Sequence, residues 1–145
     1  MGKKQKIWRV DMNFIEPLTS ARAEGVDSYS HKLNYYNPQF PNGLMGVSSY
    51  KSVLLKNIYP NIDILFYSIG TQFKYDYIVN KGGNINQIQF AIDGAQKVVL
   101  QNNIITMKTP YATIHDNIPK SYGVKDNKNA PLNLHFTKSK NNIFS

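Results

Sequence analysis

The feature that most constrains this chain is an alternation of apolar and polar side chains with a period of two residues. In QFKYDYIVN, residues 72–80, every second residue from Phe73 to Val79 is aromatic or aliphatic, and the residues between them are mostly polar. This is the pattern of a half-buried strand. No long stretch keeps the i, i+3, i+4, i+7 spacing of an amphipathic helix, and glutamate appears only twice. The sequence therefore predicts an all-β protein.

Similar runs rich in Ile, Val, Tyr, Phe and Thr recur between short clusters of Asn, Gly and Pro. We expect about nine to eleven short strands, arranged as a sandwich or as layered antiparallel sheets, with little or no helix. Asn102 and Asn103 separate two of these runs and predict a tight hairpin turn, because Asn tolerates the left-handed conformation. Residues 37–46 and 125–131 read as loops, and 132–138 as a last strand.

The length of 145 residues predicts one domain with a sizeable core. We expect a single β domain over residues 9–137. Residues 1–8 read as a basic leader or an added start, and 138–145 as a loose polar tail. With no cysteine in the chain, a disulfide framework, a thiolate nucleophile and a cysteine zinc site are all excluded.

The net charge of +8 is concentrated near the two ends of the chain. Residues 10–109 carry eight basic and seven acidic side chains, so the middle is almost neutral. A nucleic-acid site needs a concentrated basic face, and we therefore expect no nucleic-acid partner. No run of apolar residues is long enough for a transmembrane helix, so we expect no membrane insertion.

The stretch KNIYPNIDILFYS, residues 56–68, predicts a strand, a sharp corner and a second strand. Tyr59 and Pro60 would fix the corner, since proline holds φ near −65° and tyrosine packs well. Asp63 would tie the turn through local hydrogen bonds. The alternative pairs Asp63 with Asp76 as a ligand site for calcium or a sugar, although calcium needs about six to eight oxygen ligands.

No motif assigns a catalytic residue, a metal ligand or a cofactor. The three histidines are isolated, and no nucleophile elbow or metalloprotease motif is present. A hydrolase using Asp63, Asp76 and His115 remains the third choice, behind two non-enzymatic functions.

The second choice is a carbohydrate-binding module, because aromatic side chains in loops can form a platform on which sugars stack. Tyr35, Tyr36 and Phe40 are the candidates for such a rim, since they lie in or beside the segment expected to be a loop.

The order of four segments resembles a known family. The segments are KLNYYNP (32–38), YKSVLLKNIYPNIDILFYS (50–68), FKYDYIVNKGGNINQIQFAIDGAQKVVL (73–100) and IPKSY (118–122). They resemble the YPGID…YDF…PGADP pattern of an N-terminal β-rich domain of unknown function, over about residues 9–123. Asn61 stands in place of the glycine of YPGID, which implies a glycine-like position in the turn, since Asn accepts positive φ. NKGGNINQI stands in place of the PGADP segment.

The resemblance implies a place in large bacterial secreted or cell-surface proteins. In that family the domain precedes SBBP β-propeller repeats, PKD or Ig-like modules, and a type IX secretion or gliding-motility-associated sorting domain. The first choice is therefore a non-enzymatic structural or adhesive module, whose partners are neighbouring domains of a larger protein and, for the carbohydrate-binding alternative, surface glycans.

Overall fold

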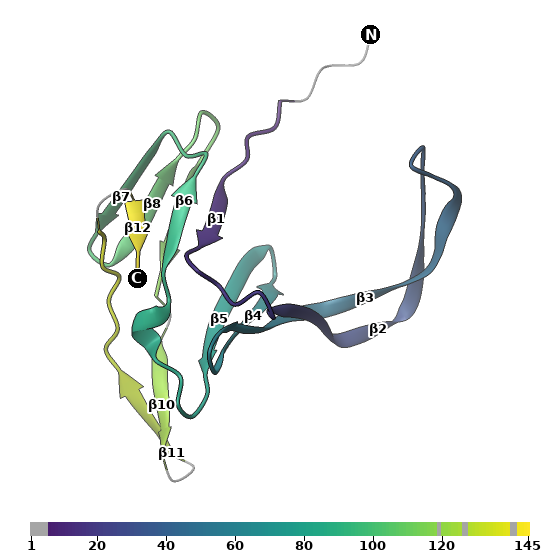
Figure 1. Cartoon of the computed structure of the whole chain (residues 1–145). Helices are drawn as coiled ribbons and strands as arrows, with labels where there is room; N and C mark the ends of the chain where they lie inside the picture. The colour runs from purple at the N-terminus through teal and green to yellow at the C-terminus, as the bar shows by residue number, and fades with distance from the viewer. Residues whose placement is uncertain (1–5, 119, 126–127, 140–141) are drawn as a thin grey trace. The chain divides into compact units, whose positions relative to one another are not determined.

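The computed structural model describes residues 6–118, 120–125, 128–139 and 142–145 (Figure 1). The prediction of an all-β protein is confirmed. The described residues include the 3-10 turn η1, Ile85–Gln87, and none of their helices is long and apolar enough to cross a membrane. The strands within these ranges are β1 Asp11–Phe14, β2 Arg22–Asn37, β3 Phe40–Tyr59, β4 Ile62–Ile69, β5 Gln72–Val79, β6 Phe90–Asp93, β7 Lys97–Gln101, β8 Ile104–Lys108, β9 Thr113–Asn117, β10 Ser121–Lys125, β11 Lys128–Leu132 and β12 Ile143–Phe144.

The strands belong to two compact units. Unit 1 joins Met1–Ile15 to Ile88–Ser145, and unit 2 is Glu16–Gln87. The single domain expected over 9–137 is thus grouped into two parts, which we describe separately.

Unit 1 holds two three-stranded antiparallel sheets, β1-β6-β12 and β7-β8-β9, and the hairpin β10-β11. Both three-stranded sheets contribute to one core. Phe90 and Phe144 stack on each other from paired strands, and Ile105 of β8 is fully buried with them. Burial of this kind typically contributes about 1.5–3 kcal/mol for each large apolar side chain.

The hairpin β7–β8 turns where the sequence predicted. Asn102 and Asn103 have φ of 50° and 61°. Two successive residues with positive φ define the primed turn whose twist matches that of the flanking strands.

Several expectations for the ends of unit 1 are wrong. The segment 125–131, expected to be a loop, contributes to the hairpin β10–β11, whereas 132–138 is mostly without strand structure. The tail is not loose either, because β12 pairs with β6 and buries Phe144 completely. At the other end, the Trp8 indole donates a hydrogen bond of 2.6 Å to the Gly94 carbonyl, so part of the expected leader is held to the unit.

Unit 2 is built on one antiparallel sheet in the order β2-β3-β4-β5. The register of β5 with β4 places Tyr77 opposite Ile64 and Val79 opposite Ile62. Directly opposite residues share a face, and both isoleucines are fully buried. The half-buried face predicted for β5 is confirmed only in part, because Phe73 and Val79 are 69% and 41% exposed.

The hairpin β2–β3 extends well beyond the rest of its sheet (Figure 1). Pairing of β3 with β4 begins at Ser52, whereas pairing of β2 with β3 continues from Ser28↔Tyr50 to Asn37↔Phe40. We call residues 28–50 the hairpin arm.

The arm corrects the expectation of a loop over 37–46. The Asn37 Oδ1 accepts hydrogen bonds from the Gln39 and Phe40 amides and closes a short turn. Gly43 and Gly46 have φ of 73° and 67° in a part of β3 where the register shifts. These glycines let the ladder continue through bulges, so a stretch with the composition of a loop forms a strand.

Candidate functional site

The corner of KNIYPNIDILFYS is the two-residue turn between β3 and β4. Tyr59 is buried and lies opposite Ile62, and Pro60 is exposed. Asn61 has φ of 60°, the left-handed conformation expected of a residue in glycine's place. Its carbonyl accepts a hydrogen bond of 2.9 Å from the Asn80 amide, which joins the corner to the end of β5.

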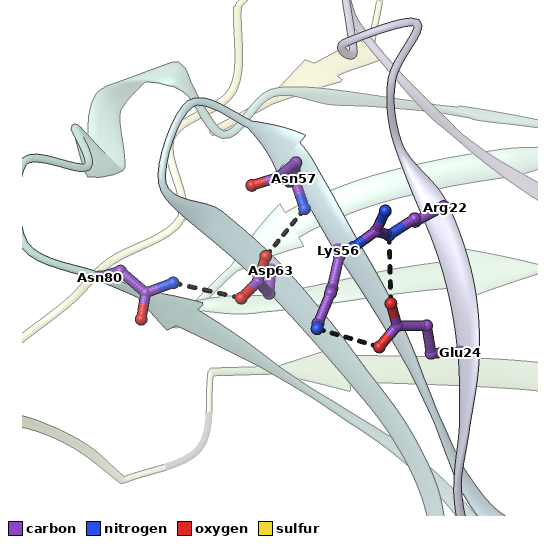
Figure 2. Close-up of polar contacts among 6 residues, drawn as sticks. All are labelled: Arg22, Glu24, Lys56, Asn57, Asp63 and Asn80. Carbon is purple, nitrogen blue, oxygen red and sulfur yellow. Dashed lines mark hydrogen bonds and ion pairs between the residues drawn. The ribbon is translucent and has the colours of Figure 1, made fainter.

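Asp63 joins two segments on either side of this corner (Figure 2). Its Oδ1 accepts a hydrogen bond of 2.8 Å from the backbone N–H of Asn57, and its Oδ2 accepts one of 3.1 Å from the Asn80 side chain. Asn57 has φ of 52° and sits where the β3–β4 register shifts. The carboxylate thus holds a bulge of β3 against the end of β5, which is a structural task.

A small charge network lies nearby on β2 and β3 (Figure 2). Glu24 contacts Lys56 at 3.0 Å and Arg22 at 3.1 Å. The hydrogen bond from Lys56 is the main reason why the pKa of Glu24 lies below its ordinary value of 4.5. Solvent screens these side chains, so the network contributes little to stability.

Asp76 has a different partner. Its Oδ2 accepts a hydrogen bond of 3.0 Å from the Tyr67 hydroxyl, which raises the pKa of Tyr67 above 10.0. Asp63 and Asp76 occupy diagonal positions on one face of β4 and β5, where backbones are typically about 7–8 Å apart. Each carboxylate is bound to groups of the protein. Nowhere in the described residues do three His, Cys, Asp or Glu side chains gather as metal ligands would.

His115 lies on β9 of unit 1, whereas Asp63 and Asp76 belong to unit 2. The His115 Nδ1 is 3.1 Å from the Thr106 hydroxyl on the neighbouring strand. The three residues of the hydrolase hypothesis therefore do not come from one compact unit.

The three candidate aromatic residues all lie on the hairpin arm and are exposed. Tyr35, Tyr36 and Phe40 keep 47%, 71% and 43% of their surface accessible. The Tyr36 ring lies over Gly43, where a Cβ would come within 2.8 Å of it, and its hydroxyl is 3.3 Å from the Met45 sulfur. Glycine at position 43 thus leaves room for the tyrosine ring.

Sequence reasoning missed how far the exposed apolar surface of the arm extends. Its exposed large hydrophobic side chains are Tyr29, Leu33, Tyr35, Tyr36, Phe40, Leu44, Met45 and Tyr50. Lys32 is the only residue with a formal charge within 28–50, and its ammonium donates to the Ser48 hydroxyl at 2.6 Å. The near absence of charge over this stretch was the available signal, since strands that face water on both sides are normally rich in charge.

The family described as a domain of unknown function (DUF7948) matches residues 2–145. The chain belongs to this family. Membership in DUF7948 confirms the coarser expectation of a domain of unknown function. No match was found to a curated protein or to a solved structure.

Proposed function

We propose that this chain is a non-enzymatic structural or adhesive module of a secreted or cell-surface bacterial protein, and that its hairpin arm contacts a protein partner. The observation that carries the proposal is the arm, in which eight large hydrophobic side chains are exposed beside a single formal charge. Exposed apolar surface beyond a few hundred Å² marks an interaction site in most soluble proteins.

The geometry of the arm supports a role in contact. A two-stranded hairpin is at best marginally stable alone in water. Residues 28–50 receive no pairing from β4, whose register with β3 begins at Ser52. A partner that covers the arm would supply the missing packing, and neighbouring domains of a larger protein are the natural candidates.

The polar residues support a structural role as well. Asp63 holds the corner and Asp76 holds Tyr67, so the two carboxylates named for catalysis or calcium serve the sheet. The resemblance to domains that precede repeat arrays and sorting domains supports the surface location.

A deletion of the arm tests the proposal. Residues 28–50 are replaced by Asn-Gly in the parent protein, which closes the hairpin next to the four-stranded sheet. We expect circular dichroism to show that unit 2 remains folded. In calorimetry, we expect the adjoining domains to unfold independently of this module once the arm is deleted. Unchanged coupling would remove the arm from the proposal. Protease treatment of intact cells tests location, and a protected module would contradict surface exposure.

Carbohydrate binding is the second candidate, favoured by the exposure of Tyr35, Tyr36 and Phe40. Binding on a glycan array that is lost in both Tyr35→Ala and Tyr36→Ala would support it. A flat response of the unaltered chain would eliminate it.

A further inference from the structure

The outer side of β2 is the part of the arm best suited to accept another strand. β2 stands at one end of the order β2-β3-β4-β5, and no strand in the described part of the chain pairs with its other side. An edge strand presents backbone N–H and C=O groups in a row, which is a template for pairing.

Natural edge strands usually carry charges, prolines or bulges that prevent such pairing. The first part of β2 has these features, with Arg22, Glu24, Asp27 and Lys32. The stretch Leu33–Asn37, LNYYN, has none: no charge, no proline and no glycine. Its five residues match the usual length of a strand, about 5–6 residues.

The other edges of this sheet are protected. The arm part of β3 carries Pro41 and the bulges at Gly43 and Gly46. β5, the opposite end strand, carries Lys74 and Asp76. The unprotected segment is therefore confined to the outer half of β2.

We propose that Leu33–Asn37 pairs with the same segment of a second copy of this chain, antiparallel and across a two-fold axis near Tyr35. This inference rests on the proposed function, because it names the protein partner that the arm contacts. A strand can pair with its own copy in this way because the antiparallel ladder has two-fold symmetry. Such pairing uses both free edges and closes the assembly at two copies.

The charge distribution favours a second copy over a foreign protein. Apart from Lys32, whose ammonium is bound to Ser48, the arm offers no charge that would select a complementary partner. Pairing with itself needs none, and an axis near Tyr35 sets Tyr35 opposite its own copy, with Leu33 opposite Asn37 and Tyr36 opposite Asn34 of the second copy.

The contact area sets the expected affinity. The three exposed side chains bury on the order of 100 Å² each, so two copies bury roughly 600 Å² of side-chain surface. This lies below the roughly 1,200 Å² of a standard interface, so we expect a weak dimer that forms only at high protein concentration.

Sedimentation velocity of the whole chain, from roughly 1 µM to 1 mM at about 0.15 M salt, tests this inference. We expect a reversible shift from monomer to dimer, lost in Tyr35→Lys and retained in the matched variant Phe73→Lys on β5. Folding of each variant is checked by circular dichroism. A monomer throughout the series, a dimer unaffected by Tyr35→Lys, or assemblies growing beyond two copies would each overturn the proposal.

A thiol placed at the axis gives a second readout. The chain has no cysteine, so a single one can form a disulfide only with another copy. Tyr35→Cys is expected to cross-link under mild oxidation much faster than Phe73→Cys, because directly opposite positions meet the distance that a disulfide requires. Equal rates would contradict the two-fold axis near Tyr35.

The two proposals fail in different ways. If the chain stays monomeric but its arm is covered in the parent protein, only the inference of a second copy is contradicted. If the arm is exposed to solvent both in the isolated chain and in the parent protein, the proposed function is contradicted too.

Discussion

The carboxylate of Asp63 accepts a hydrogen bond from the backbone N–H of Asn57, six residues earlier in the chain, at 2.8 Å. Its second oxygen accepts from Asn80, at the end of β5. Asp63→Ala removes both bonds and leaves the bulge at Asn57 without its acceptor. We expect a loss of about 2 kcal/mol in the free energy of unfolding, measured by urea denaturation.

Asp63→Asn keeps one carbonyl oxygen and should cost roughly half as much. Asp27→Asn is the control, because Asp27 is exposed and its φ of 54° suits asparagine equally well. If Asp63→Ala is as harmless as this control, Asp63 does not hold the corner.

Asn103 has a task that its neighbour Asn102 lacks. Its side chain donates to the Leu134 carbonyl at 3.2 Å and accepts from the Phe136 amide at 2.6 Å. Asn103→Gly preserves the positive φ but loses both bonds, so we expect a cost of about 2 kcal/mol in unfolding free energy. Asn102→Gly should change stability by less than about 0.5 kcal/mol. Equal effects of the two changes would contradict this assignment.

Phe144 lies next to the end of the sequence and is fully buried between β6 and the rest of the unit 1 core. Phe144→Ala should cost about 3–5 kcal/mol, because it removes apolar burial and leaves a cavity. Leu132→Ala is the comparison, since Leu132 is 48% exposed. Thermal unfolding followed by near-UV circular dichroism measures both, and similar midpoints would show that the tail is not part of the core.

The lowered pKa of Glu24 predicts how the stability of the fold depends on pH. Its folded-state pKa is depressed, mainly by the hydrogen bond from Lys56, so the network favours the folded state above pH 4.5. That contribution disappears as the pH falls through the lowered pKa. Carboxyl titration by NMR should show the pKa of Glu24 rising toward 4.5 in Lys56→Gln and staying unchanged in Arg9→Gln. A pKa that does not respond to Lys56→Gln would exclude this cause.

Local sequence signals were sufficient for part of this structure. The alternation from Phe73 to Val79 identified β5 as a strand, and Asn102 and Asn103 identified their hairpin turn. Asn61 was identified through the resemblance, which puts it in the place of a turn glycine, and its φ of 60° agrees. These features depend on backbone conformation and period, which neighbouring residues determine.

Features that depend on distant residues could not be read from the sequence. Phe144 sits in a polar tail, and its burial comes from pairing with β6, more than fifty residues earlier. Gly43 and Gly46 suggested a loop, because composition does not distinguish a bulged strand from a turn. The exposure of Tyr36 depends on which strands pair with the arm, and that is a property of the whole sheet.

Amide hydrogen exchange of residues 28–50 tests the central claim most directly. The measurement compares the isolated chain at low concentration, where it is monomeric, with the parent protein. The arm amides on the outer side of β2 should exchange rapidly in the isolated chain and be slowed at least about tenfold in the parent protein, because a partner covers them. The core strand β8 serves as the internal reference and should exchange slowly in both. Equally rapid exchange of the arm in both samples would contradict the account that the arm is a contact element.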